Sequence, residues 1–196
     1  MAEEKYKRTN APAAHRERIP HASGDEAGLG LPGPAAGRWY VLHTRSRQEK
    51  ALAADLVAMR IAHYLPLVRQ VRYYGKRKAL VDLPLFPGYV FLRGTSEQAY
   101  RADDTDRVAC IIRVPDQARL DGELRNLHLA LSRGVPLAPY PFLKKGVRVE
   151  VRSGPLRGLQ GIVEQRSGGG RLILQVDMVA KAVSLEIDAS LLEPME

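Results

Sequence analysis

Trp39-Tyr40-Val41-Leu42 is the first run of four large apolar residues in the sequence. Aromatic and β-branched residues without a polar interruption are typical of a buried strand. Ser46 and Glu49 follow at the spacing of a capping box, with Ser46 as the N-cap of a helix. We therefore expect a buried strand that is followed directly by a helix.

The residues before this strand have a different composition. Residues 1–37 are rich in Ala, Pro and Gly, and their few large apolar side chains show no period. Such a segment cannot bury enough apolar surface to offset the loss of chain entropy on folding. We expect residues 1–37 to be a disordered tail, an inert extension rather than a binding arm.

The residues after the first helix alternate between expected strands and helices. The strands are short and rich in aromatic or β-branched residues, and they cover residues 64–74, 79–83, 89–92 and 108–114. A short helix is expected over residues 97–101, and Asp121 is expected to cap a helix that ends at Gly134. This order predicts an α+β fold over residues 38–134, in which one antiparallel sheet has helices against one face.

A proline-bearing segment, residues 135–143, is expected to link this region to a second domain. Residues 144–196 contain four or five short alternating strands that are separated by glycine turns. Closure of such a sheet removes its exposed edges, so we expect a small, SH3-like β-barrel.

The composition limits the possible classes of protein. The chain has 196 residues, and of its formal net charge of +8 a surplus of 7 lies in residues 38–136, which hold 17 basic and 10 acidic residues. The single cysteine, Cys110, excludes a disulfide framework and a Cys-based zinc site, and its apolar neighbours predict a buried thiol. No run has the length of a membrane span, and the first residues do not resemble a secretion signal. We expect a monomer in the cytoplasm, with no membrane contact.

No group of residues in the sequence has the pattern of a catalytic site. His43 has no nucleophile or orienting group at a useful spacing, and we find no paired acid and base, metal-ligand or phosphate-loop motif. We therefore expect a protein that is not an enzyme and has no cofactor or metal.

Two sets of motifs resemble NusG-type transcription elongation factors. Trp39-Tyr40-Val41-Leu42-His43-Thr44, Gln48-Glu49-Lys50-Ala51 and Pro84-Leu85-Phe86-Pro87-Gly88-Tyr89-Val90-Phe91 resemble the N-terminal domain of that family. Lys145-Gly146-Val147-Arg148-Val149 and Ser153-Gly154-Pro155-Leu156, with residues 158–163, resemble the KOW motif of its C-terminal domain. The resemblance covers residues 38–193.

The resemblance implies an elongation or antitermination factor. Its N-terminal domain would bind RNA polymerase beside the DNA of the elongation complex and suppress pausing, by favouring one conformation of the polymerase. Its KOW domain would tether a small-subunit ribosomal protein or the termination factor Rho. The alternative is a KOW-containing, RNA-binding ribosomal or ribosome-assembly protein, which would have no use for the domain at residues 38–134.

The resemblance also implies an apolar patch that receives the polymerase. The residues of this sequence that match it are His43, Tyr89, Phe91, Ile112 and Leu127. Alternate residues of a strand must face the core, so each of them could instead be a core residue.

Arg69, Arg72, Lys76, Arg77 and Lys78, with tyrosines between them, form the most basic stretch. A hairpin of this kind could lie near DNA, where phosphate contacts add affinity and the tyrosines stack on unpaired bases, or it could be a solvated tip.

In the KOW domain, the segment that meets the partner is expected at Met178, Val179 and Lys181. Ala180 and Lys181 stand where the family often has Gly and Arg, and residues 100–104 lack the His-Thr-Thr run of RfaH-type members. With the long tail, these departures favour a specialised, RfaH-like paralogue over the housekeeping factor.

Overall fold

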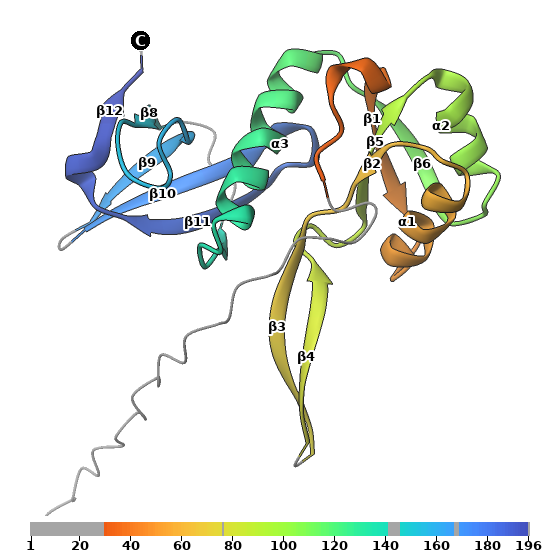
Figure 1. The fold of residues 1–196 in the computed structure, drawn as a ribbon, viewed down its shortest axis with the longest axis horizontal. Coiled ribbons are helices and arrows are strands. Elements are labelled where there is room, and N and C mark those ends of the chain that lie inside the picture. The colour runs from red at the N-terminus through yellow and green to blue at the C-terminus, as the bar shows by residue number, and fades with distance from the viewer. Residues whose placement is uncertain (1–29, 76, 141–145, 167–168, 196) are drawn as a thin grey trace, which may run out of the picture.

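The computed structural model describes residues 30–75, 77–140, 146–166 and 169–195 (Figure 1). Most of the expected tail, residues 1–29, and the basic residue Lys76 lie outside these ranges. The first described element is the short 3-10 helix η1 (Pro34–Ala36), which directly precedes the first strand.

A four-stranded antiparallel sheet forms the centre of the N-terminal region. Its strands are, in spatial order, β2 (His63–Tyr64), β5 (Tyr89–Gly94), β1 (Arg38–Thr44) and β6 (Val108–Arg113). Side chains alternate between the two faces along each strand, and β1 is buried on both faces.

Helices cover both faces of this sheet. On one face, Leu42 of β1 packs in a cluster with Leu52 of α1 (Glu49–Ala58) and Ala99 of α2 (Ser96–Asp103). On the other face, Val41 belongs to a cluster that includes Leu124 of α3 (Gln117–Ser132). The expectation that helices cover only one face is therefore wrong, because consecutive apolar residues in β1 require a cover on each side.

Strands β3 (Leu67–Tyr74) and β4 (Arg77–Pro84) form a separate two-stranded sheet that projects away from the rest of the molecule (Figure 1). The strand expected over residues 64–74 is interrupted before Leu67, at Pro66, which has no N–H to donate to a sheet. The carbonyl of Pro66 instead accepts a hydrogen bond from the N–H of Leu85, 2.8 Å away, at the base of the hairpin.

The C-terminal region is a six-stranded antiparallel sheet. In spatial order its strands are β12 (Leu192–Pro194), β8 (Val147–Val151), β9 (Gln160–Arg166), β10 (Gly169–Val176), β11 (Lys181–Ile187) and β7 (Ala138–Tyr140). Part of the expected linker is thus the edge strand β7, which pairs with β11. With the first sheet and the three α-helices of the described ranges, the structure has the expected α+β class.

Two expected helix caps are wrong. Helix α1 begins at Glu49, and its N-cap residue Gln48 makes no side-chain cap bond, so Ser46 has no capping role. Helix α3 begins four residues before Asp121, with Asp116 as the N-cap that accepts a hydrogen bond from the N–H of Arg119. The capping box occurs instead at α2, where Thr95 and Gln98 bond to each other's backbone N–H.

Helix α3 stands between the two sheets and packs on both (Figure 1). Its buried residues recur at helical spacing, and they are Leu120, Leu124, Leu127 and Ala130. They join the first sheet to apolar residues of the C-terminal sheet such as Leu172 and Leu174 in one continuous cluster. The two regions of the chain therefore share a hydrophobic core.

Candidate functional site

Four of the five residues predicted for the apolar patch lie on the α3 face of the first sheet. Antiparallel register places His43 opposite Tyr89, and it places Val41 between Phe91 and Ile112. These residues form two neighbouring rows across β5, β1 and β6. Their assembly follows from strand register, because positions two apart on one strand share a face.

The row of His43 is the more open of the two. The rings of His43 and Tyr89 lie 5.1 Å apart between centroids and are tilted by 32°. Gly88 precedes Tyr89 at a φ of 89°, so the chain turns closely beside the His43 ring. Cys110 continues the same row on β6 and is exposed, so its predicted burial is wrong. It lies near the end of the outermost strand β6, where the register with β1 shifts.

Most of the row of Phe91 is covered by α3 and is not accessible to a partner. Phe91 and Leu127 are fully buried in the shared core, with Tyr89 and Ile112 packed at its edge. In this arrangement His43, Tyr89 and Ile112 are the patch residues that a partner can reach without moving α3 or the C-terminal sheet.

Polar contacts hold α3 to the C-terminal sheet. The Oε2 of Glu123 accepts a hydrogen bond of 3.2 Å from the N–H of Asp177, and the Oδ1 of Asn126 accepts one of 3.1 Å from the N–H of Gln160. Arg119 forms ion pairs with both Asp177 and Glu123. Burial raises the pKa of Glu123 above its ordinary range, even though the bond and charge of Arg119 act in the opposite direction.

A buried arginine fixes the other side of α3. Arg93 of β5 forms an ion pair of 2.5 Å with Asp121, which also accepts a hydrogen bond of 2.9 Å from the indole N–H of Trp39. The guanidinium lies 4.8 Å from the centre of the Trp39 ring. Burial alone would raise the pKa of Asp121, but these bonds and the charges of Arg93 and Arg125 outweigh it, so the pKa lies below its usual value.

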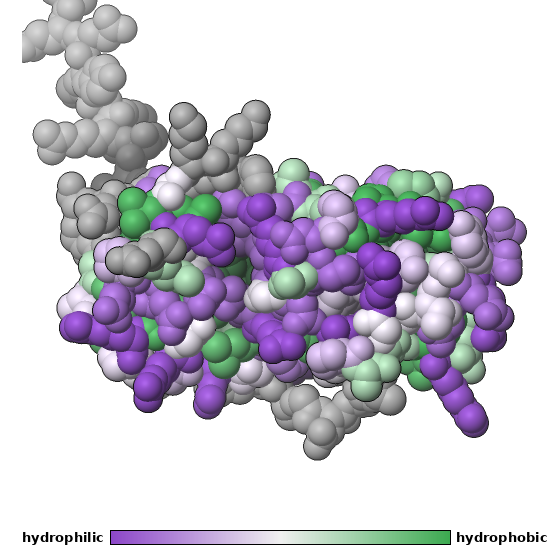
Figure 2. Space-filling model, turned by 90° about the horizontal axis from the view of Figure 1, so that it is seen from above, coloured by the Kyte–Doolittle hydropathy of each residue, from purple (hydrophilic) through white to green (hydrophobic). Residues whose placement is uncertain are grey.

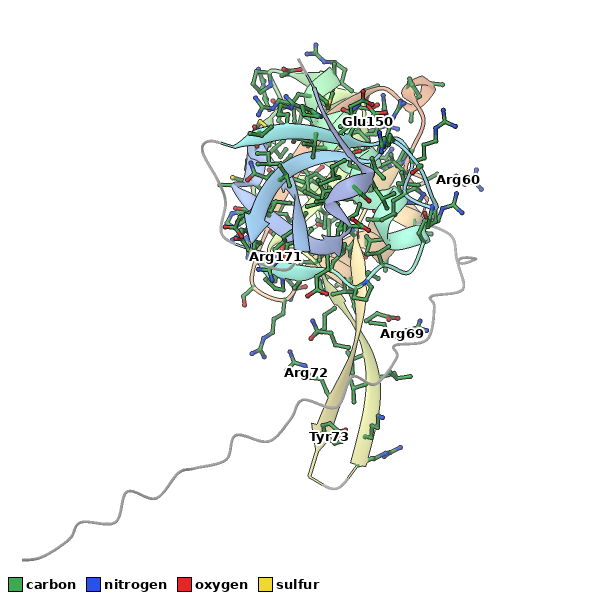
Figure 3. The ribbon with its side chains drawn as sticks, turned by 90° about the vertical axis from the view of Figure 1, so that its left-hand side faces the viewer. Arg60, Arg69, Arg72, Tyr73, Glu150 and Arg171 are labelled. Atoms are coloured by element: carbon green, nitrogen blue, oxygen red, sulfur yellow. The ribbon has the colours of Figure 1, made fainter. Side chains whose placement is uncertain are left out.

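The basic hairpin has two different faces. Arg72 and Arg77 lie on one face and are exposed, whereas Tyr73 lies on the other with Val71 and Leu80. Figure 3 shows Arg69 and Arg72 pointing to opposite sides of the ribbon, with Tyr73 nearer its tip.

The charges of the hairpin are not equally available. Arg69 is bonded to Asp82 across the strands at 2.9 Å, and this hydrogen bond lowers the pKa of Asp82. Arg69 is therefore largely neutralised, whereas Arg72 and Arg77 are exposed cations on the other face of the hairpin. Lys78 also makes an interaction within the chain. Tyr73 is 68% exposed and is the most accessible aromatic residue of the hairpin whose side chain is described.

The predicted contact segment of the C-terminal region lies between β10 and β11. Met178 and Val179 belong to the 3-10 helix η2 (Asp177–Val179), and Val179 is buried. Ala180 follows in the left-handed conformation, at φ 47° and ψ 43°, where a residue with a side chain is strained. Lys181 is the exposed member of the predicted set.

The described residues contain no cluster of three or more His, Cys, Asp or Glu side chains that could hold a metal ion. Within the same part of the chain, no helix is both long and apolar enough to cross a membrane. On the face shown in Figure 2, hydrophilic residues predominate over the middle, and hydrophobic residues gather in separate patches.

One family model matches part of the chain. The family model described as "NusG: Transcription termination factor nusG" matches residues 37–120, from β1 to the first turn of α3. No curated protein matches the sequence.

Solved structures with a similar chain trace include one described as "Domain interaction in Thermotoga maritima NusG". It is 21% identical and has a TM-score of 0.42, and the match covers 84% of this chain and 100% of that one. Another, described as "Crystal Structure of MjSpt4:Spt5 complex conformation B", is 17% identical with a TM-score of 0.27, and the match covers 81% of this chain and 97% of that one.

Proposed function

Since residues 37–120 match the NusG family model, we propose that this chain is a transcription elongation or antitermination factor that binds RNA polymerase through that region. The family match carries the proposal. It covers the sheet on which the predicted patch residues His43, Tyr89, Phe91 and Ile112 share one face.

The domain would act without chemistry of its own. A factor that binds one conformation of the polymerase more tightly than another shifts the population toward it and so lowers the frequency of pausing. The row of His43 and Tyr89 is the surface through which we expect first contact, because it combines apolar area with accessibility.

The hairpin and the C-terminal sheet supply two further parts of the proposal. Arg72 and Arg77 would lie near phosphates of DNA in the elongation complex. The exposed Lys181, beside η2, would contribute to binding a ribosomal protein or Rho through the C-terminal domain.

The experiment that tests the proposal measures binding and pausing with the full chain. Purified RNA polymerase from a bacterium should be retained by the immobilised protein, and addition of the protein should shorten pauses in single-round transcription. The double variant His43→Ala/Tyr89→Ala should lose both effects while its circular dichroism stays unchanged. Arg133→Ala, at an exposed position after α3, is the matched control and should retain both.

Binding to free RNA with no retention of polymerase would overturn the proposal and favour the ribosomal alternative. Loss of secondary structure in the double variant would mean that these side chains support the core. The single variant His43→Ala, which removes a half-buried ring from the surface row, then tests the contact separately.

A further inference from the structure

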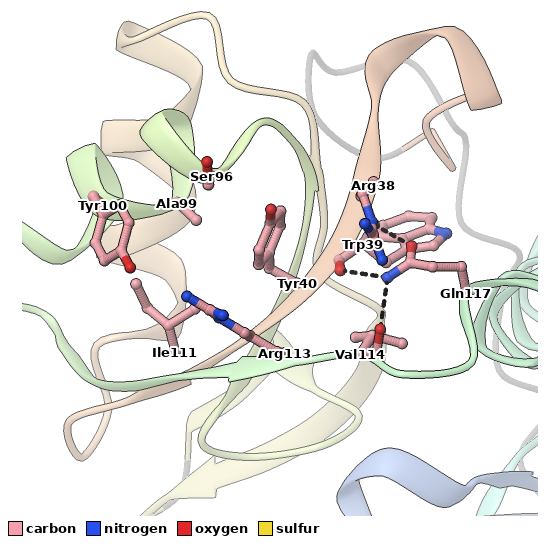
Figure 4. A pocket seen from close by; sticks show the side chains of 10 residues that line it. All are labelled: Arg38, Trp39, Tyr40, Ser96, Ala99, Tyr100, Ile111, Arg113, Val114 and Gln117. Carbon is pink, nitrogen blue, oxygen red and sulfur yellow. Dashed lines mark hydrogen bonds between the residues drawn. The ribbon is translucent and has the colours of Figure 1, made fainter.

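A pocket of about 470 Å³ opens on the side of the first sheet that faces away from α3 (Figure 4). Its floor consists of Arg38 and Tyr40 of β1 and Ile111 and Arg113 of β6. Antiparallel register places Tyr40 directly opposite Arg113. Helix α2 forms a wall with Ser96, Ala99 and Tyr100.

The pocket is cationic and aromatic. None of its ten lining residues is acidic. Arg38 and Arg113 are exposed, and neither has an ion-pair partner among the described residues. Two unneutralised guanidinium groups in one pocket favour an anion, and phosphate is the anion whose geometry arginine matches best.

The pocket also offers two aromatic rings. Tyr40 is half-buried and Tyr100 is 56% exposed. In the view of Figure 4 the guanidinium of Arg113 lies between these two rings, and Arg38 lies beyond Tyr40. A flat ring that enters beside the arginines could therefore stack on a tyrosine while its phosphate meets a guanidinium.

The far wall of the pocket is rigid. The side-chain oxygen of Gln117 accepts a hydrogen bond from the N–H of Trp39, and its amide donates 3.0 Å bonds to the carbonyls of Trp39 and Val114. These bonds fix the start of β1 against the start of α3. A preformed wall lowers the ordering cost of binding a ligand.

We propose that this pocket binds one nucleotide unit, with the base stacked on Tyr40 or Tyr100 and the phosphate held by Arg113, while Arg38 adds positive charge at the other side of Tyr40. Its volume falls in the range of about 300–1,000 Å³ that is usual for small-ligand sites. The unit is either a free nucleotide or one nucleotide of a single strand, since both present the same base and phosphate. The site faces away from the patch of His43 and Tyr89, so it does not depend on polymerase binding.

The test uses the full chain and three probes: UMP, a fluorescein-labelled oligodeoxythymidylate of twelve nucleotides, and inorganic phosphate alone. Titrations are followed by fluorescence anisotropy and by amide chemical shifts of Trp39 and Gln117. Arg113→Gln and Tyr100→Ala are each expected to weaken binding by about fivefold or more. The matched control Arg133→Gln removes an exposed arginine at the opposite end of α3 and should leave binding unchanged.

Binding of UMP assigns the pocket to free nucleotides, and binding of the oligonucleotide alone assigns it to a strand. Either result supports the proposal if the pocket variants reduce it. Equal binding of inorganic phosphate, or displacement of the probe by polyglutamate at the same charge, would overturn it. So would an affinity that Arg133→Gln lowers as much as Arg113→Gln. Both pocket substitutions replace exposed side chains, and circular dichroism checks that each variant is folded.

Discussion

Glu123 of α3 accepts a hydrogen bond from the backbone N–H of Asp177 in the C-terminal sheet, and Arg119 forms ion pairs with both carboxylates. This small network lies beside the apolar contact between α3 and β10. Helix α3 therefore packs on the first sheet with one side and on the C-terminal sheet with the other.

Exchange of the Arg119 and Asp177 charges tests whether this network holds the two regions together. Arg119→Asp alone should lower the free energy of unfolding by about 0.5–1 kcal/mol, because the pair is partly exposed. The double variant Arg119→Asp/Asp177→Arg should recover most of the loss. Urea unfolding measures both values, and a double variant that is no better than the single one would contradict the pairing.

The pH dependence of stability should report on Glu123. Its pKa is raised on folding by burial, so the proton binds more tightly to the folded chain than to the unfolded chain. The stabilisation that Glu123 provides is complete below its pKa in the unfolded chain, which is about 4.3. It is lost as the pH rises through the higher pKa of the folded chain. Glu123→Gln should remove this loss of stability at higher pH. Above about pH 4, the free energy of unfolding of the variant should therefore change less with pH than that of the unsubstituted chain. An unchanged slope would mean that the carboxyl is not buried in solution.

Asp121→Asn should be among the most destabilising single substitutions in the N-terminal region. The change leaves the buried Arg93 without its carboxylate partner, which costs about 2–4 kcal/mol. Asp116→Asn keeps a side chain that can cap α3 and is the matched control, with a change of a few tenths expected. Thermal unfolding followed by circular dichroism measures both variants, and equal melting temperatures would refute the role of the pair.

Ala180→Gly should stabilise the protein, because Ala180 is held in the left-handed conformation. Relief of that strain outweighs the larger chain entropy of glycine and leaves a gain of about 0.5–1 kcal/mol. Ala189→Gly, at an exposed residue with a negative φ, should instead cost up to about 1 kcal/mol. Urea unfolding of the two variants should therefore give changes of opposite sign.

The hairpin predicts a salt-dependent contribution to nucleic-acid affinity. Arg72→Gln/Arg77→Gln should reduce binding of the full chain to a forked DNA and flatten its dependence on salt, because each lost phosphate contact removes about one unit of slope. Arg69→Gln should have a smaller effect, since Arg69 already pairs with Asp82. Equal effects of the two variants would assign the affinity to overall charge rather than to one face of the ribbon.

Much of the first sheet could be predicted from the sequence. The strands expected at residues 39–42 and 89–92 are present. Trp39, Val41 and Leu42 are buried as expected, because a strand without polar residues needs cover on both faces. The register of β1 with β5 and β6 then decides which residues share a face. The patch residues depend on the family resemblance. The predicted burial of Cys110 is wrong, because the apolar residues beside it in the sequence do not reveal that it lies on an edge strand.

Helix boundaries were less predictable, and the errors have a common cause. Ser46, Asp116 and Asp121 all have side chains that can cap a helix, but only one of them does so. Asp121 is used instead as the partner of Arg93, which lies 28 residues earlier in the chain. Tertiary pairing of this kind leaves no local signal. The pocket beside α2 could not be predicted either, since its arginines come from separate strands.

The contacts of Arg93 extend upstream of the first strand. Its guanidinium donates hydrogen bonds of 3.0 and 3.1 Å to the carbonyls of Pro32 and Gly37. Those two carbonyls belong to a stretch whose composition predicts a tail, yet they complete the coordination of a buried cation. A fragment that starts at Arg38 would lack both of these carbonyl acceptors and would leave Arg93 with Asp121 as its acceptor. A domain excised for biophysical work should therefore begin at or before Leu31.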